Sequence, residues 1–397
     1  MPEPSQRART IERRRRPQEQ RRRNRRRWIL VAFLALATAG AAGAAWADPD
    51  ALVGGSDDHP KASRTPKRPA HVRRHVAPRG PLQGALLVAD RGNDRILLVN
   101  EHHQILWWFP TPGDKRRGVH LNFDDDAFVA SGGHAIVANE EEAHTVVSID
   151  VRTHHRVHLY GEPGVPGSAQ GLLNTPDDAY PLPNGDVVVA DAYNCRIVWV
   201  RSHRIVHQLG RAGVCTHDPP HSFGAVNGDT PLPDGGLLVS EIPGHWVDQI
   251  GPSGKLVWSL QAPVRYPSDP QPLANGLVLL ADYSRPGHVV ITNHRGRVFW
   301  QYGPASGPGM LDHPSLAIML PDGNIAVNDD FRHRVVVIDF RSRQIVWQYG
   351  HTDLGGRRAG FLNIPDGMDF VPVDRGGRPL WAQVHHPAPP ARPLLSG

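Results

Sequence analysis

The sequence predicts an all-β protein built from six copies of one unit that is about fifty residues long. A short apolar run ending in an acidic or amide residue recurs six times, and an Asn-Gly or Asp-Gly pair precedes four of these runs. Gly (40) and Pro (38) make up about a fifth of the 397 residues, which is a heavy load for a helical protein. These observations favour short strands joined by tight turns.

Each apolar run is rich in Val, Ile and Leu, as expected of a strand that is buried on both faces. The Asn-Gly and Asp-Gly pairs supply the positive φ angles that hairpin turns need, so each run is expected to be the second strand of a hairpin. The residues that end the runs, called anchors here, are spaced 49, 52, 50, 41 and 47 positions apart. They are Asp90, Asn139, Asp191, Glu241, Asp282 and Asp329.

Each unit is expected to contain four strands, named A to D. In the third unit these strands cover 176–182, 186–190, 196–200 and 204–209. The first unit has no room for a strand A, whereas an unpaired strand A, 365–371, follows the sixth unit. Pairing this last strand with the first unit would join the two ends of the domain and leave no open edge. Residues 378–384 are a candidate extra strand without a place in the repeat.

The repeat resembles the NHL repeat family. In the third unit the resemblance rests on Tyr160-Gly161, Asn174-Thr175-Pro176, Asn184-Gly185 and the segment from Asp191 to Ile197. The segments 90–96 and 329–335 match well too, whereas the units of Glu241 and Asp282 lack the arginine of the pattern. The resemblance covers roughly 81–372 and implies a six-bladed β-propeller, in agreement with the six units counted.

The N-terminal region predicts export. Residues 1–27 contain twelve Arg and three Glu, and the uncharged segment 28–47 has about the length that spans a bilayer. Positive charge holds the preceding tail in the cytoplasm. Ala45-Trp46-Ala47 has the small-x-small pattern of a cleavage site, so the segment is either an uncleaved signal anchor or a cleaved signal peptide. In both cases the rest of the chain is extracytoplasmic, tethered to the membrane by one span or secreted.

The remaining chain divides into a Pro-, Arg- and His-rich linker over 48–80, the propeller over 81–384 and a disordered tail over 385–397. Residues 81–397 carry a net charge of −7, although the whole chain carries +5. An acidic, exported domain is a poor partner for nucleic acid, which we therefore do not expect as a ligand. Forty Arg against four Lys are typical of a GC-rich bacterial genome.

A column of polar residues lies near the start of the six strands A. Its members are Asp125, Asp177, Asn227, Ser268, Ser315 and Asp366, and the next position adds Asp126, Asp178 and Asp269. Because strands A line the axis of a propeller, the column would form a ring at the channel. The ring is either a ligand or cation site, since calcium takes six to eight oxygen ligands, or a set of loop caps that bond backbone amides. The candidate ligand contacts are Asp125, Asp177, Asn227, Asp269 and Asp366, and the candidate metal ligands are Asp125, Asp177 and Asp366.

Histidines approach the same face. His120, His217, His221 and His313 lie in the connections between units. NHL-like amidating lyases hold zinc with histidines from separate blades, so the resemblance adds zinc to calcium as a candidate metal and makes His221 or His313 a candidate acid, base or zinc ligand. With 23 His in the chain, some will lie close together by chance.

Strand D carries a column of large rings, four of them Trp: Trp107, His158, His207, Trp258, Trp300 and Trp347. The segments ending at Trp258 and Trp300 resemble the last part of the motif of PQQ-dependent quinoproteins, but the rest of that motif is missing and there are six units rather than eight. We therefore expect these rings to pack one blade against the next. Cys195 and Cys215 fall on one face of adjacent elements and are candidates for a disulfide in an exported chain, the alternative being two free thiols.

Two functions remain open at this stage. The first is a binding or sensor module that holds a protein, a glycan or a small ligand on its loop face, since propellers serve many functions as rigid platforms. The second is a metal-dependent extracytoplasmic enzyme with its site at the top of the channel. A lyase or hydrolase would fit, as would an arylsulfotransferase-like enzyme, because those enzymes resemble this chain in being exported propellers with a catalytic histidine.

Overall fold

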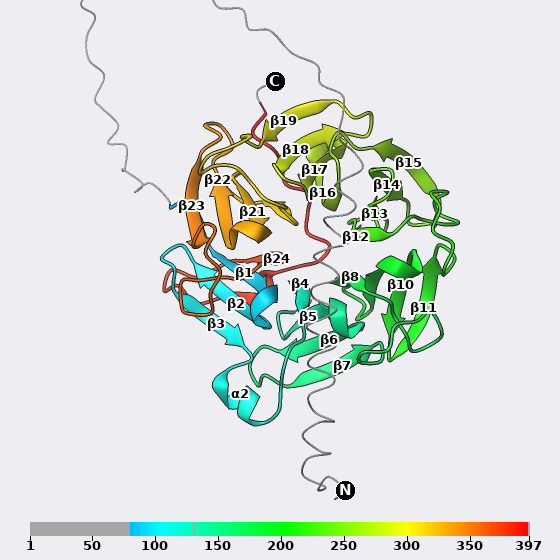
Figure 1. The fold of residues 1–397 in the computed structure, drawn as a ribbon, viewed down its shortest axis with the longest axis horizontal. Coiled ribbons are helices and arrows are strands. Elements are labelled where there is room, and N and C mark those ends of the chain that lie inside the picture. The colour runs from blue at the N-terminus through cyan, green and yellow to red at the C-terminus, as the bar shows by residue number, and fades with distance from the viewer. Residues whose placement is uncertain (1–79, 131, 396–397) are drawn as a thin grey trace, which may run out of the picture. The chain divides into compact units, whose positions relative to one another are not determined.

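The computed structural model describes residues 80–130 and 132–395. This part of the chain is a six-bladed β-propeller, with six four-stranded antiparallel sheets arranged around a central axis (Figure 1). The segments 1–27, 28–47 and 48–80, apart from Gly80, lie outside the described residues. Within the described part, no helix has the length and apolar character needed to span a membrane.

The strands of each blade follow one another from the inner strand A to the outer strand D. Blade 1 consists of β24 (Met368–Val371), β1 (Ala85–Asp90), β2 (Arg95–Asn100) and β3 (Ile105–Phe109). Blade 2 consists of β4 (Asp124–Val129), β5 (Ala135–Glu140), β6 (Thr145–Asp150) and β7 (Arg156–Tyr160). Blade 3 consists of β8 (Pro176–Pro181), β9 (Val187–Asp191), β10 (Arg196–Arg201) and β11 (Arg204–Leu209).

The other three blades repeat this order. Blade 4 consists of β12 (Val226–Pro231), β13 (Leu237–Glu241), β14 (Trp246–Ile250) and β15 (Leu256–Gln261). Blade 5 consists of β16 (Pro267–Leu273), β17 (Leu277–Asp282), β18 (His288–Asn293) and β19 (Val298–Tyr302). Blade 6 consists of β20 (Ala317–Met319), β21 (Ile325–Asp329), β22 (Arg334–Ile338) and β23 (Ile345–Gly350).

Helices are short and lie in the connections. They are η1 (Arg91–Asn93), α2 (Pro112–Arg116), η2 (Glu141–Ala143), η3 (Ala192–Asn194), η4 (Ala274–Gly276), η5 (Asp330–Arg332) and η6 (Trp381–Gln383). Four of them, η1, η2, η3 and η5, form the B–C turns of their blades. These turns and the D–A connections lie at the end of the blades where strand A begins, which we call the upper face.

The ring closes as the sequence predicts. Strand β24 pairs with β1 in an antiparallel register that runs from Ala85 opposite Val371 to Val88 opposite Met368. The last strand of the repeat thus completes the first blade, and the hydrogen-bonding edge of β1 is covered. Residues 378–384, the candidate extra strand, instead contain η6, and Val373 and Pro379 form only an isolated bridge.

One anchor was assigned to the wrong residue. Strand β5 ends at Glu140 rather than Asn139, and Glu140 pairs with Thr145 as Asp90 pairs with Arg95. Asn139 serves a different purpose, because its side-chain amide donates to the carbonyl oxygens of Pro176 (2.9 Å) and Asp177 (2.8 Å) in the next blade. An acidic residue therefore ends strand B in all six blades.

The anchor carboxylates fasten each D–A connection to its own blade. In every blade the anchor accepts a hydrogen bond from a backbone N–H just before strand A, as Asp90 does from Asn363 (2.7 Å) and Asp191 from Asn174 (2.7 Å). In four blades an arginine on strand C or D neutralises the anchor. These pairs are Arg95–Asp90 (2.6 Å), Arg156–Glu140 (2.6 Å), Arg196–Asp191 (2.7 Å) and Arg334–Asp329 (2.7 Å). The arginines of blades 1, 3 and 6 also donate to loop carbonyls, so one buried ion pair holds a whole loop.

Three of the four tryptophans in the strand D column donate a hydrogen bond to the neighbouring blade, whereas Trp258 Nε1 donates to Gln249 Oε1 of its own blade (2.6 Å). Trp107 Nε1 donates to the carbonyl of Val151 in blade 2 (2.8 Å), and Trp300 Nε1 to that of Phe340 in blade 6 (2.8 Å). Trp347 Nε1 donates to the carbonyl of Glu101 in blade 1 (2.9 Å), across the closure of the ring. These indoles therefore combine apolar packing between blades with a satisfied donor.

The C-terminal segment contacts the propeller where the sequence analysis expected a disordered tail. In Figure 1 the red chain after β24 runs across the ring. Its contacts are with the A–B turns of the blades, at the end opposite the B–C turns. Trp381 packs edge-on against Trp107, Ala391 forms a parallel bridge with Leu273, and Leu394 lies against Gly323. Residues 385–395 are thus placed by specific contacts, which the low apolar periodicity of this Pro-rich stretch did not indicate.

We expect the buried ion pairs of the anchors to dominate the stability of the ring. Replacing Arg196 by Met should lower the free energy of unfolding by about 3–5 kcal/mol, because the Asp191 carboxylate would remain buried without a counter-charge. Urea denaturation of the full chain measures this loss. The matched control is Arg378→Met, which removes an arginine paired with Asp374 at 2.9 Å but 85% exposed, and should cause no measurable change. Equal losses in the two variants would contradict the argument.

Candidate functional site

The inner strands carry a β-bulge near their start. In blades 2 to 5 the pairing register between strands A and B shifts at this point. A bulge interrupts the alternation of side chains and re-aims one of them. In blade 2, Asp125 pairs with Arg91 while the next residue, Asp126, lies against Gly367 of the neighbouring inner strand. Consecutive acidic residues can therefore both face the axis, and they form two polar layers in the channel.

The upper layer is the polar ring that the sequence analysis singled out. It contains Asp125, Asp177, Asn227, Ser268, Ser315 and Asp366. Asn227 donates from Nδ2 to Asp177 Oδ2 (3.0 Å) and accepts at Oδ1 from Ser268 Oγ (2.8 Å), which connects blades 3, 4 and 5. Ser315 Oγ donates to Asp330 Oδ1 (2.8 Å) within blade 6. The structure thus brings the predicted residues to one place, the upper end of the propeller axis, and we call this group of residues the mouth.

Arg91 is the cation of this mouth, and the sequence analysis missed it. Its guanidinium forms ion pairs with Asp125 (2.8 Å), Asp366 and Glu141, and it stacks on the ring of Phe123 at 4.2 Å. Burial favours the neutral guanidine, but these three carboxylates raise the pKa of Arg91 well above its ordinary value. The arginine therefore stays charged at any physiological pH and joins blades 1 and 2.

A second column contributes to the same mouth. It consists of the residues that follow the anchors, namely Arg91, Glu141, Ala192, Ile242, Tyr283 and Asp330. Glu141, Tyr283 and Asp330 add two carboxyls and a phenol to the ring of strand A. A signal for this column was present in the sequence, because every member directly follows an anchor. With the second anchor predicted at Asn139, the residue that follows it is Glu140, so Glu141 is missing from the column read from the sequence.

The mouth has more carboxyl groups than cations. Asp125, Glu141 and Asp366 pair with the guanidinium of Arg91, whereas Asp330 lies close enough to feel its charge and Asp177 interacts with Asp125 and Glu141. Burial, followed by the charge of Glu141, raises the pKa of Asp177 to about 7. Burial and the charge of Asp330 likewise raise the pKa of Tyr283 well above its ordinary value, and burial and Asp177 do the same for Tyr266. The two phenols therefore remain protonated and can donate hydrogen bonds at the mouth.

A lower acidic layer lies beneath the mouth. It contains Asp126, Asp178, Asp229 and Asp269, all at most 5% exposed. Oδ1 of Asp126 and both carboxylate oxygens of Asp229 have no hydrogen-bond partner. Asp178 accepts from the backbone N–H of Ala179 (2.7 Å) and of Asp229 (3.3 Å), yet burial raises its pKa to about 8. These carboxyls therefore favour protonation, because burial and their mutual repulsion oppose the charged form.

The lower end of the channel is closed by aromatic rings and the C-terminal segment. Phe128 and Tyr180 stack with their centroids 3.8 Å apart, and the imidazole of His386 meets both rings edge-on at 5.6 Å. His386 Nε2 lies 2.9 Å from Asp369 Oδ2 and is only 7% exposed. Side chains therefore fill the propeller axis at its lower end, and the polar ring lies at the upper end.

The predicted metal ligands of the mouth do not form a coordination site. Arg91 lies between Asp125 and Asp366, where the sequence analysis placed a calcium or zinc ion. A group that could hold a metal ion lies elsewhere, at His217, Glu241 and Asp248 next to blade 4. One ligand atom from each of these residues lies within 4.8 Å of the others, and no other three His, Cys, Asp or Glu residues in the described part of the chain meet this condition. Asp269, in the lower layer, is not part of such a group either.

The other predicted site residues lie on the upper face in different settings. His313 Nδ1 is 2.7 Å from Asp312 Oδ1, and its ring packs against Tyr283 of the mouth at 5.0 Å. His221 is exposed and contributes its backbone N–H to the turn at Asp218. Cys195 and Cys215 form a disulfide with their Cα atoms 5.2 Å apart, which ties the connection 210–225 to the η3 turn.

Comparison with known proteins shows the fold. Neither the scan against protein-family models nor the search of the curated proteins found a match. A solved structure of a nidogen/laminin complex is similar with a TM-score of 0.51 and 10% identity, over 72% of this chain and 97% of that chain. A protein of unknown function from Bacteroides caccae gives a TM-score of 0.49 and 19% identity, over 72% and 98% of the two chains. A streptogramin B lyase gives 0.48 and 16%, over 75% and 89%. This likeness is one of architecture.

The acidic channel should make stability fall as pH rises. A carboxyl whose pKa is raised by folding, as that of Asp178 is from 3.8 to about 8, holds its proton more tightly in the folded state. Its contribution is complete below the unfolded pKa and is lost as pH rises through about 8. The full chain in chelator should therefore melt at a higher temperature at pH 5.5 than at pH 8.5. Asp178→Asn should raise the Tm at pH 8.5 by roughly 5 °C and weaken this dependence.

The control is Asp234→Asn at an exposed hairpin turn, which should keep the wild-type pH profile. A Tm that increases from pH 5.5 to pH 8.5, or an identical profile in wild type and Asp178→Asn, would show that the channel carboxyls do not control stability.

Proposed function

We propose that this chain is an extracytoplasmic NHL-type propeller that binds a small cationic ligand at the mouth of its channel. The observation that carries the proposal is the charge balance of the mouth, where the guanidinium of Arg91 is the one cation of the described residues among five carboxyls, those of Asp125, Glu141, Asp177, Asp330 and Asp366. A second observation is independent of charge number. The buried Asp330 Oδ2 accepts from no described donor and faces the carboxyl of Asp366 instead.

Aromatic rings next to the carboxyls favour an organic cation. Tyr266 and Tyr283 meet edge-on with their centroids 5.1 Å apart, and Tyr193 and Phe331 are 45% and 44% exposed on the neighbouring turns. Aromatic faces attract ammonium and guanidinium groups, and carboxylates supply their hydrogen-bond acceptors. A primary amine or guanidine matches both features, whereas an anion would face several like charges.

The closed lower end of the channel supports binding rather than passage. His386, Phe128 and Tyr180 fill the channel below the acidic layers, so a ligand can approach only from the upper face. The fixed backbone of the inner strands would hold the mouth residues in place before the ligand arrives, which lowers the entropic cost of binding.

The location of the domain is part of the proposal. The charge pattern of 1–47 supports a single-pass membrane anchor or a cleaved signal, with the propeller on the outer side. The disulfide between Cys195 and Cys215 is consistent with an oxidising compartment. The alternative of a metal-dependent lyase, hydrolase or arylsulfotransferase-like enzyme at the channel top has less support, because Arg91 occupies the place that the metal would need.

The test is a titration of the purified full chain with agmatine and spermidine by calorimetry. We expect binding that strengthens up to about tenfold between pH 6 and pH 8, because a cation favours the ionised form of Asp177, whose pKa is about 7 in the free protein. Asp177→Asn should weaken binding by roughly tenfold at pH 8 and remove most of this pH dependence.

Controls separate the mouth from general acidity. Asp234→Asn, at an exposed turn on the opposite face, should bind both amines as the wild type does. The proposal is wrong if glucose or phosphate binds as tightly as the amines, or if Asp177→Asn and Asp366→Asn bind the amines with unchanged affinity at both pH values.

A further inference from the structure

Blade 4 departs from the repeat at its anchor. In blades 1, 3 and 6 the first residue of strand C is the arginine that neutralises the anchor, and in blade 2 Arg156 of strand D does so. In blade 5 the strand begins with His288, whose Nδ1 lies 3.4 Å from Asp282. In blade 4 the strand begins with Trp246, opposite Glu241. The buried anchor of this blade therefore needs another positive partner.

The same blade carries a second carboxylate at a core position. Asp248 lies opposite Val239, and the equivalent residues of strand C in the other blades are aliphatic. They are Leu97, Val147, Val198, Val290 and Val336. Asp248 is fully buried, and its carboxyl lies against that of Glu241 and near Ser259, with no arginine or lysine of the described chain beside it. Burying an unpaired carboxylate is costly, so its environment must offer a compensating charge.

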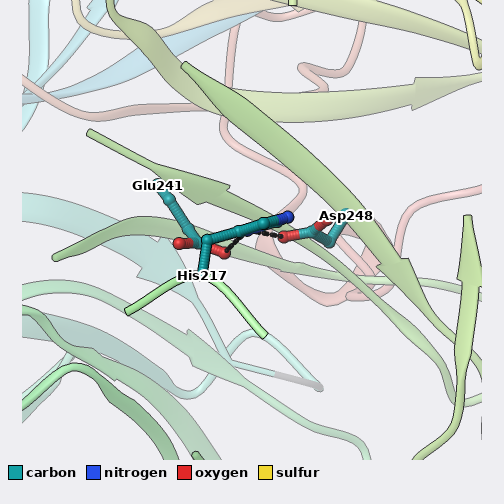
Figure 2. Close-up of side chains that lie close together, drawn as sticks. All are labelled: His217, Glu241 and Asp248. Carbon is teal, nitrogen blue, oxygen red and sulfur yellow. Dashed lines mark hydrogen bonds and ion pairs between the residues drawn. The ribbon is translucent and has the colours of Figure 1, made fainter. Parts of the chain in front are cut away.

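The connection before blade 4 brings an imidazole to these two carboxylates. His217 Nδ1 lies 2.9 Å from Glu241 Oε1 and 4.0 Å from Asp248 Oδ2, so it points between them, as Figure 2 shows. The imidazole stacks on Trp246 with the centroids 4.0 Å apart and the planes 5° from parallel. The disulfide at Cys215, two residues earlier, restricts where this loop can lie.

Two other polar atoms of these three residues have hydrogen-bond partners outside the group. His217 Nε2 is 3.2 Å from Ser259 Oγ, so the ring is oriented with Nδ1 toward the two carboxyls, and Glu241 Oε2 accepts from the backbone N–H of Gly224. Metal-binding histidines are oriented in this way through their second nitrogen. One oxygen of each carboxylate and the histidine nitrogen lie within 4.8 Å of one another.

We propose that His217, Glu241 and Asp248 bind one Zn²⁺ ion, which fastens the connection 210–225 to blade 4. One imidazole nitrogen and two carboxylate oxygens are ligands that zinc accepts, at distances of about 2.0–2.2 Å after a small closure of the group. The ion supplies the two positive charges that two buried carboxylates require, whereas a protonated His217 supplies only one. In blade 4 the metal thus takes the part that an arginine plays in blades 1, 3 and 6.

Three protein ligands leave one position of a tetrahedral zinc ion for a water molecule. Glu241 and Asp248 are fully buried and the side chain of His217 is 24% exposed, so the ion would lie beneath the connection that it fastens. The proposal is separate from the amine site, since it uses no residue of the mouth. The two are therefore testable independently in the same full-length protein.

The experiment measures zinc content and affinity of the full chain after treatment with a chelator and addition of Zn²⁺. We expect one zinc per chain and a Tm that falls on renewed chelation. Asp248→Val, which installs the residue of blade 3 at this position, and His217→Gln should each abolish stoichiometric zinc binding. Asp248→Asn tests the same ligand at nearly constant volume, in case the valine is poorly accommodated. Ser259→Ala should weaken zinc affinity by about 10–100-fold, because it removes only the partner that orients His217.

The matched control is His288→Gln in blade 5, where a histidine also faces an anchor but a valine takes the place of Asp248. This variant should bind zinc like the wild type. The proposal is overturned if the wild type takes up no zinc, if Asp248→Asn and His217→Gln retain it, or if Asp177→Asn at the mouth removes it. If the wild type takes up no zinc, the two carboxylates are neutralised instead by His217 and by a proton shared between Glu241 and Asp248.

Discussion

The upper face of this propeller depends on one repeated interaction, the acceptance of a loop N–H by the buried carboxylate that ends each strand B. Asp90, for example, holds the N–H of Asn363 at 2.7 Å just before the inner strand of its blade. Because the same residue also begins the B–C turn, the carboxylate fixes the D–A connection and the turn together. Both columns of the channel mouth project from these two segments. A loss of the anchor geometry would therefore displace the residues of the mouth as well as weaken the blade.

The residues at the propeller axis show where this fold can accept charged side chains. Strands packed on both faces leave little freedom, so the bulges of the inner strands are the places where two successive carboxyls, such as Asp125 and Asp126, can face the axis. The carboxyls of the lower layer are unfavourable when charged, since burial raises the pKa of Asp178 to about 8. Arginine–carboxylate pairs and indole contacts between blades offset this cost elsewhere in the ring. The mouth is thus a polar site held by an otherwise apolar and rigid framework.

Much of the architecture could be predicted from the sequence, because strand and turn patterns depend on neighbouring residues. The six units, the strands of the third blade and the closure through 365–371 follow from apolar runs and Asn-Gly or Asp-Gly turns. The site was predicted only in part. Asp177 and Asp366 stand out in a column, but their partner Arg91 lies in a turn of blade 1 and meets Asp125 of blade 2 only after the ring has formed. The contacts of residues 385–395 were missed for the same reason, since they lack a periodic pattern and depend on the assembled lower face.

A repeat makes the unusual residues of single blades informative. At a position where five blades bury Leu or Val, an aspartate such as Asp248 must be compensated locally, because the strands around it are the same as in the other blades. The compensating side chain is His217, which does not belong to the repeat pattern and lies on a connection held by a disulfide. The reasoning applies equally to Arg91, which introduces a cation at a position where blades 3 and 4 carry Ala192 and Ile242. In both cases the departure places charge where the fold alone needs none. The carboxylates of Asp125, Glu141 and Asp366 balance the charge of Arg91, and the zinc ion that we propose would balance that of Asp248.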